Sequence, residues 1–169
     1  AGFFGALNGT AKNIIFDKAT VTSISAPNGK GNTDNGIAVV AGSIYTSGSI
    51  EGVTVNNSRV SGNRYVGGVS GYTYGSVKNC TVENTTVTST PDNLHNEEYD
   101  NGDKAGGVVG AFWHDNTHEI SGNTVNNVTV KGYRDIGGIV GYANGRVTEN
   151  TVNGLTLIQD YSILTTPST

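Results

Sequence analysis

The residues best suited to bind a ligand fall in two segments of this 169-residue chain. The segment 112–118 contains the only tryptophan, Trp113, followed directly by His114 and Asp115. An aromatic ring beside an imidazole and a carboxylate is typical of loops that recognise sugars or proteins. We therefore predict that Trp113, His114 and Asp115 bind a ligand. The alternative is a corner loop whose tryptophan only covers the edge of the fold.

The second segment, 88–104, is acidic and contains His95 and Tyr99, which we add to the candidate ligand-binding residues. Its end carries Asp100 and Asp103, whose carboxylate oxygens at short spacing suit Ca²⁺. The spacing matches neither an EF-hand nor a calcium-binding nonapeptide repeat, so a solvated acidic loop is the competing interpretation. Apart from this possible Ca²⁺ site, we expect no cofactor.

Catalytic patterns are weak in this chain. His118-Glu119 begins like the HExxH of zinc proteases, but Gly122 occupies the position of the second histidine. The single cysteine, Cys80, allows neither a disulfide within the chain nor a zinc cluster. The few scattered carboxylates do not require the groove of a polysaccharide-cleaving β-helix enzyme. We expect no enzymatic activity, and a polysaccharide-active lyase or hydrolase is the alternative.

Composition restricts both the fold and the partners. The chain has 25 glycines, no methionine and only 14% charged residues, which opposes helices and favours strands and turns. A net charge of -4 offers no basic face to nucleic acid or to an anionic membrane. No apolar run is long enough to cross a bilayer. We therefore expect an all-β fold with neither a nucleic-acid partner nor insertion into a membrane.

Five copies of one pattern fill the chain, and they must position the candidate residues. Four copies have a glycine-rich element, such as Gly68-Val69-Ser70-Gly71, and the second has Ala38 and Ala41 in place of its glycines. In every copy apolar residues five positions apart follow, as in Val77, Val82 and Val87. Apolar residues two positions apart share one face of a strand, so each five-residue side points two side chains inward. One copy cannot bury this face alone, and stacking the copies about 4.8 Å apart would bury it.

The pattern therefore predicts one domain, residues 1–169, folded as a parallel β-solenoid of about five stacked repeats. We expect Val82, Val125 and Val152 to form one buried column. A second column would contain Ile14, Val53, Cys80, Asn123 and Asn150. Long and short connections alternate, and the long ones, 22–36 and 88–104, are expected to project from one side of the stack and to carry ligand recognition.

The repeat resembles the GLUG motif, through Gly67-Gly68-Val69-Ser70-Gly71 followed by Val77-Lys78-Asn79-Cys80-Thr81-Val82. The glycine element recurs at 106–110 and at 137–141. This resemblance implies a secreted or surface-anchored bacterial protein, since such repeats occur in adhesins and in IgA-cleaving metallopeptidases outside the catalytic part. It implies an extracellular location and a repeat scaffold, and it names no ligand. We expect a larger parent chain, because the sequence starts within a repeat, and a stalk or binding role toward a host glycan or surface protein.

Threonines suggest a third class of function. The run from Thr85 to Thr90, with Thr124 and Thr129, would form ladders suited to ice or mineral surfaces if the windings stack in register. The competing interpretation is ordinary strand surface, because β-branched threonine is common there.

Overall fold

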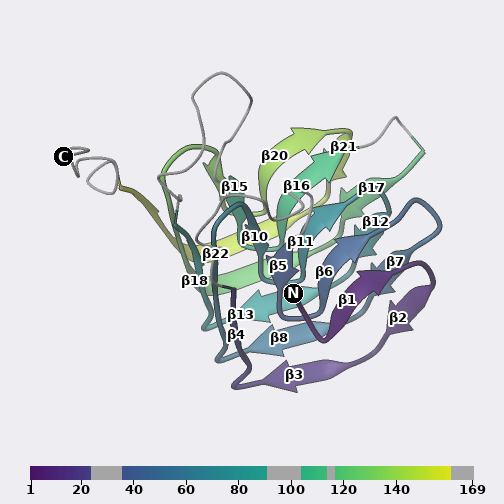
Figure 1. Ribbon diagram of the computed structural model, residues 1–169, viewed down its shortest axis with the longest axis horizontal. Helices are drawn as coiled ribbons and strands as arrows, with labels where there is room; N and C mark the ends of the chain where they lie inside the picture. The colour runs from purple at the N-terminus through teal and green to yellow at the C-terminus, as the bar shows by residue number, and fades with distance from the viewer. Residues whose placement is uncertain (24–35, 91–103, 114–116, 161–169) are drawn as a thin grey trace, which may run out of the picture.

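The all-β prediction is confirmed by the computed structural model, which describes residues 1–23, 36–90, 104–113 and 117–160 (Figure 1). Strands account for 64% of the described residues, which contain no helix. It follows that no helix within these ranges is long and apolar enough to cross a membrane.

The chain passes five times around one path, and we number these passes windings 1 to 5. Winding 1 contains β1 (Phe4–Leu7), β2 (Thr10–Lys12), β3 (Ile15–Asp17) and β4 (Thr20–Thr22). Winding 2 contains β5 (Ile37–Ala38), β6 (Ala41–Ile44), β7 (Ser49–Glu51), β8 (Thr54–Asn56) and β9 (Arg59–Gly62). Winding 3 contains β10 (Tyr65–Gly67), β11 (Ser70–Thr73), β12 (Ser76–Lys78), β13 (Thr81–Glu83) and β14 (Thr86–Ser89).

The last two windings have longer strands. Winding 4 contains β15 (Lys104–Gly106), β16 (Val109–Trp113), β17 (Glu119–Ser121) and β18 (Thr124–Gly132). Winding 5 contains β19 (Ile136–Gly137), β20 (Val140–Asn144), β21 (Arg146–Thr148) and β22 (Thr151–Gln159). The strands β18 and β22 each run through a corner that separates two strands in the earlier windings.

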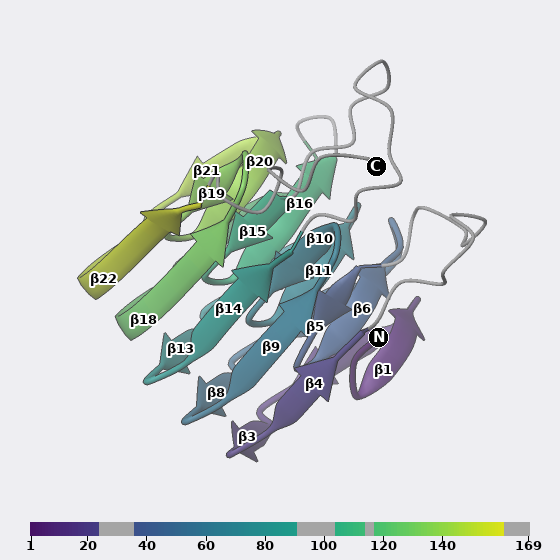
Figure 2. The same ribbon diagram turned by 60° about the vertical axis from the view of Figure 1, so that its left-hand side comes forward.

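Strands at equivalent positions of successive windings pair in parallel and form four sheets (Figure 2). Sheet A has the order β1-β6-β11-β16-β20, sheet B the order β2-β7-β12-β17-β21, and sheet D the order β19-β15-β10-β5. Sheet C has the order β3-β8-β13-β18-β14-β9-β4, with β22 paired to β18. This stacking is consistent with the predicted parallel β-solenoid.

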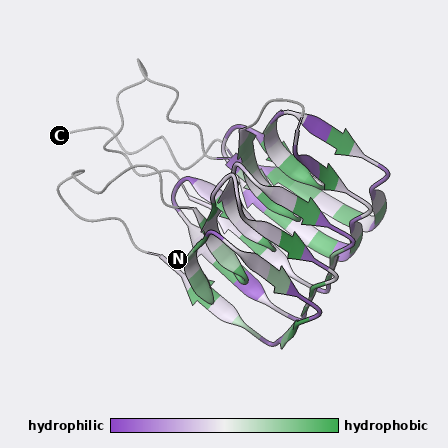
Figure 3. Cartoon of the chain, turned by 90° about the vertical axis from the view of Figure 1, so that its right-hand side faces the viewer, coloured by the Kyte–Doolittle hydropathy of each residue, from purple (hydrophilic) through white to green (hydrophobic). Residues whose placement is uncertain are grey.

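The interior consists of columns of apolar side chains, one from each winding. The register aligns Val55, Val82, Val125 and Val152, and the first three are fully buried. Apolar and polar residues accordingly alternate along the strands (Figure 3). The prediction of a uniformly buried column was wrong for Val152, which is 41% exposed because it lies on the last winding and is covered from one side only.

The predicted asparagine column is confirmed in detail. Asn123 is buried, its Oδ1 accepts from the Cys80 N–H at 2.9 Å, and its Nδ2 donates to Asn150 Oδ1 at 2.9 Å. Asn150 Nδ2 in turn donates to the Ile120 carbonyl at 2.9 Å. These amides replace the apolar residues of earlier windings without leaving buried polar atoms unpaired. Burial raises the pKa of the adjoining Cys80 thiol to about 11, so it is protonated at neutral pH.

Each five-residue side ends at a residue in the left-handed conformation, with φ from +48° to +65°. The corner between sheets B and C is formed by Asn13, Gly52, Asn79, Gly122 and Glu149. The corner within sheet C is formed by Lys18, Asn57, Asn84, Asn127 and Gly154. Glycine and asparagine adopt this conformation at low cost, which explains why they recur at these positions.

The glycine-rich elements allow sheets A and D to approach each other closely. A Cβ on Gly71 would lie 2.1 Å from the Ile37 backbone nitrogen, and a Cβ on Gly67 would lie 2.0 Å from the Ser70 carbonyl oxygen. Neither glycine has a positive φ. Close approach of the backbone therefore explains these two glycines, and left-handed geometry does not.

The two long connections begin and end at equivalent places. The first leaves sheet C after β4 and enters sheet D at β5, and the second leaves after β14 and enters at β15. Their anchors therefore lie two windings apart on the same side, as predicted. Residues 24–35 and 91–103 between the anchors lie outside the described part of the chain.

The inward and outward registers predict opposite effects of an introduced carboxylate. Val125→Asp places a charge in a fully buried column and should lower the free energy of unfolding by roughly 3–5 kcal/mol. Thr86→Asp, on the outer face of β14, should change it by no more than about 0.5 kcal/mol. Urea unfolding of both variants measures the difference, and equal losses would contradict the register.

Candidate functional site

Of the predicted ligand-binding residues, the structure places Trp113 at the end of β16. His114, Asp115, His95 and Tyr99 lie outside the described residues, as do the predicted Ca²⁺ ligands Asp100 and Asp103. Among the residues that are described, no group of three histidine, cysteine, aspartate or glutamate side chains is placed to hold a metal ion. The predictions for these six residues therefore remain predictions.

Trp113 belongs to a cluster of aromatic side chains on the outer face of sheet A. Its ring packs on Tyr142 of β20, with centroids 4.4 Å apart and planes 34° apart. Ala111 is the Cα partner of Tyr142 and lies two residues before Trp113 on β16, so its small side chain leaves room for the indole. The contact is therefore diagonal across two neighbouring strands.

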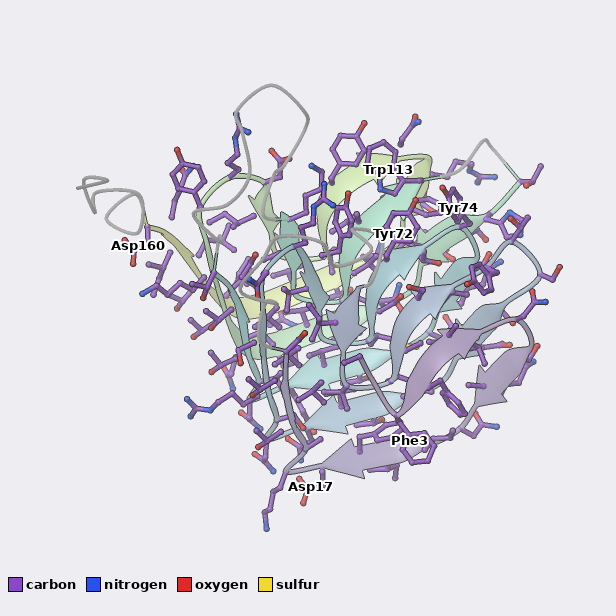
Figure 4. The ribbon with its side chains drawn as sticks, in the orientation of Figure 1. Phe3, Asp17, Tyr72, Tyr74, Trp113 and Asp160 are labelled. Carbon is purple, nitrogen blue, oxygen red and sulfur yellow. The ribbon has the colours of Figure 1, made fainter. Side chains whose placement is uncertain are left out.

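Three tyrosines of winding 3 extend this cluster. The Tyr72 ring lies 5.1 Å from Tyr74 at a near-perpendicular angle and 5.1 Å from Tyr65. The Tyr72 hydroxyl donates to the Tyr74 hydroxyl at 2.6 Å, which fixes the two rings relative to each other. Figure 4 shows Tyr72, Tyr74 and Trp113 gathered at one side of the molecule, over β11 and β16.

A cation lies beneath the cluster. The Lys104 side chain is fully buried, with Nζ 5.1 Å from the Tyr142 ring centroid and 5.9 Å from that of Tyr65. Its Nζ also lies 3.4 Å from the Asp135 carboxylate. Contact with two ring faces and a carboxylate compensates the desolvation of the ammonium group. Lys104 therefore supports the tyrosines from below and presents no accessible charge to a ligand.

The indole N–H of Trp113 is buried and has no hydrogen-bond acceptor among the residues that the structure describes. A buried donor without an acceptor costs about 1–3 kcal/mol. The core does not require an indole at the end of β16, because the tryptophan side chain lies on the outer face of the sheet. Packing of the core therefore does not explain a tryptophan at this position.

The outer face of sheet B carries charges of alternating sign. Lys12 Nζ lies 2.6 Å from Glu51, and Lys78 Nζ lies 2.7 Å from Glu119. Arg146 also contacts Glu119, at 3.6 Å. Side-chain hydrogen bonds from Lys12 and Lys78 lower the pKa of Glu51 and Glu119, respectively. We call the five residues the charge ladder: Lys12, Glu51, Lys78, Glu119 and Arg146.

The threonine columns form only in part. The register aligns Thr54, Thr81, Thr124 and Thr151 on sheet C, and it aligns Thr86 with Thr129 and Thr156. Thr85 points inward, where its hydroxyl donates to the Glu83 carbonyl. The neighbouring outward positions include Arg59, Glu83 and Lys131, so the face is not a uniform array of hydroxyl groups.

Residues 62–88 match the GLUG motif. The matched segment covers most of winding 3. There the glycines of the motif lie where sheet D passes into sheet A, and its valines belong to the inward columns. No curated protein and no solved structure matches the chain. The GLUG match thus supports a repeat scaffold and assigns no ligand.

Sequence reasoning missed Tyr72 and Tyr74, which lie within the GLUG match but point outward. It also missed Tyr142, which directly follows the glycine element of winding 5. A signal was available, because Gly71-Tyr72-Thr73-Tyr74 aligns with Gly110-Ala111-Phe112-Trp113 and with Gly141-Tyr142-Ala143-Asn144. Comparing the copies at these positions would have placed Tyr72, Tyr74, Trp113 and Tyr142 on one face.

Because Trp113 is the only tryptophan, its fluorescence reports on the aromatic cluster alone. Tyr142→Leu removes the ring that packs on the indole, so the emission should shift to longer wavelength and acrylamide quenching should increase. Phe3→Leu, a matched change on winding 1, should leave both unchanged. Identical spectra for Tyr142→Leu and the unaltered protein would contradict the packing.

The charge ladder predicts a pH dependence of stability. The lowered pKa values of Glu51 and Glu119 mean that the pairs stabilise the fold above the ordinary glutamate pKa. This stabilisation is lost as the pH falls through the lowered values. The double variant Glu51→Gln with Glu119→Gln should therefore lose less of its melting temperature between pH 5 and pH 2 than the unaltered protein. If the melting temperatures of both proteins fall equally over this range, the charge ladder is not the origin of the pH dependence.

Proposed function

We propose that this chain is a non-catalytic, extracellular module of a bacterial cell-surface protein, built as a parallel β-solenoid, that binds carbohydrate through the aromatic face of sheet A. The observation that carries the proposal is the cluster of Tyr72, Tyr74, Trp113 and Tyr142 on an outer face, where the core has no need of it. The extracellular and bacterial setting rests on the GLUG resemblance.

The chemistry of the cluster favours a sugar. Tyrosine and tryptophan present an apolar ring face, which matches the C–H face of a pyranose, and the tyrosine hydroxyls match its hydroxyl groups. Tyr74 is 38% exposed, and the Tyr72 and Trp113 side chains are half-buried. The rings are held by contacts with one another, so little side-chain entropy is lost when a ligand binds.

Other exposed apolar side chains have a different origin. Phe3 and Ile15 lie on winding 1, and Val152 and Leu157 lie on winding 5. All four belong to windings that have a neighbour on one side only, whereas Tyr72, Tyr74 and Trp113 lie on windings 3 and 4, which have neighbours on both sides. Recognition by the long connections 22–36 and 88–104 remains part of the proposal, because their described anchors lie on one side.

A glycan array tests the proposal, with the hits confirmed by calorimetry. Trp113→Ala and Tyr72→Ala should each weaken binding about tenfold or more, which corresponds to about 1.4 kcal/mol. The matched control is Phe3→Ala, which removes an exposed aromatic side chain from winding 1 and should leave binding unchanged. Circular dichroism of each variant establishes that it folds.

Two results would overturn the proposal. If both Trp113→Ala and Tyr72→Ala bind glycans as the unaltered protein does, the aromatic cluster is not the site. If incubation with uronic-acid polymers releases unsaturated products or new reducing ends, the module is an enzyme, and the polysaccharide lyase or hydrolase alternative replaces the binding role.

A further inference from the structure

The turns that join sheet A to sheet B differ in length from one winding to the next. The paired residues Ile44, Thr73 and Phe112 mark the end of sheet A, and Ser49, Ser76 and Glu119 mark the start of sheet B. The intervening segment is 45–48 in winding 2, only 74–75 in winding 3, and 113–118 in winding 4. A short turn is therefore flanked by two longer ones.

Hydrogen bonds and close packing keep the short turn of winding 3 compact. The Thr73 hydroxyl accepts from the Gly75 N–H at 2.9 Å and donates to the Gly75 carbonyl at 3.0 Å. A Cβ on Gly75 would lie 2.1 Å from the Gly48 carbonyl oxygen, so no larger residue fits there. Adjacent windings are about 4.8 Å apart, which separates the two longer turns by about 10 Å at their bases.

The turns from sheet A to sheet B form one corner of the fold. A hollow of about 370 Å³ lies beside them, on the side of sheet B. Ser49, Glu51, Ser76 and Lys78, from β7 and β12, line its floor. Its sides are formed by 46–48 of winding 2 and by Thr117 and His118 of winding 4. Its volume is in the range that holds small ligands.

The lining favours a neutral ligand rich in hydroxyl groups. Five of the lining residues carry side-chain hydroxyls: Thr46, Ser47, Ser49, Ser76 and Thr117. Those of Ser49, Ser76 and Thr117 already exchange a hydrogen bond with Thr10, the Glu119 N–H and His118, respectively. A hydroxyl both donates and accepts hydrogen bonds, as the hydroxyls of a sugar do. The charged residues favour neither an anion nor a cation, because Glu51 would repel an anion and Lys78 would repel a cation. Both belong to the charge ladder and are already paired with Lys12 and Glu119, respectively.

The same three turns start at aromatic residues. Tyr45 follows Ile44, Tyr74 follows Thr73, and Trp113 follows Phe112, so the three rings come from one level of windings 2, 3 and 4. The Tyr74 N–H donates to the Ile44 carbonyl, which continues the register beyond β11. Tyr74 and Ser76 are two residues apart, at most about 7 Å. The aromatic face and the polar hollow are therefore the two sides of one corner.

We propose that the hollow is a second subsite for a neutral oligosaccharide, which crosses the corner over winding 3 from the aromatic face to the floor formed by Ser49 and Ser76. This inference rests on the proposed function, since the aromatic face supplies the first subsite. One sugar ring packs on Tyr74 and Trp113, and the next rings along the chain exchange hydrogen bonds with the hydroxyls of the hollow.

The test uses the best neutral glycan from the array as a series from monosaccharide to hexasaccharide, with dissociation constants measured by calorimetry. Affinity should rise with length until the chain reaches the hollow. Ser76→Tyr, which fills the floor, should lower the affinity for the hexasaccharide about tenfold and leave that for the shortest binding member unchanged. Thr148→Tyr, the same change on the part of sheet B in winding 5, is the matched control.

His118→Ala tests the side of the hollow without touching a strand, and it should weaken binding of the hexasaccharide only. Raising the salt concentration should leave the affinity unchanged, since the ligand is neutral. The inference is overturned if Ser76→Tyr and His118→Ala bind the hexasaccharide normally while Trp113→Ala does not. That outcome leaves the proposed function standing.

Two further outcomes also decide against the inference. If no member of the series binds and Trp113→Ala changes nothing on the array, the proposed function itself fails. If an extended peptide binds in the hollow and the oligosaccharides do not, the hollow is a protein-binding site.

Discussion

The left-handed corner residues are the constraint on which the rest of the structure depends. A side of five residues closes in the same way in every winding only if its last residue has a positive φ, and the corner residues from Asn13 to Gly154 all do. Because each winding then follows the same path, its backbone groups face those of the next winding, and equivalent side chains fall into columns. Glycine or asparagine at most of these corners keeps the conformational cost low.

The sequence was sufficient to predict which residues form the interior, and it was insufficient to predict where that interior ends. Apolar residues five positions apart identified the buried columns, including the amides of Asn123 and Asn150, because burial within a winding follows from local spacing. Exposure of Val152 depends on what lies above it, which no local pattern encodes. The close packing of Gly71 against Ile37 likewise joins segments from different windings, so the sequence could indicate a special role for the glycine without distinguishing its cause.

The candidate site was predictable only through its single tryptophan. Tyr72 and Tyr142 flank Ala111 from the two neighbouring windings, and this arrangement emerges only when three copies are aligned in register. The burial of Lys104 between two tyrosine rings depends on contacts between windings 3, 4 and 5. The scaffold repeats, whereas the outward residues differ between copies, and the recognition that we propose rests on those differences.

The charge ladder has a consequence for how the chain reaches this structure. Proteins built from similar repeats are prone to misassembly, because a winding that skips its neighbour still finds a strand of nearly the same apolar pattern. In this chain, skipping winding 2 would pair Lys12 with Lys78 in place of the oppositely charged Glu51. Like charges in contact disfavour that arrangement. Alternation of sign along one face thus discriminates the correct neighbour where the valines of the interior cannot.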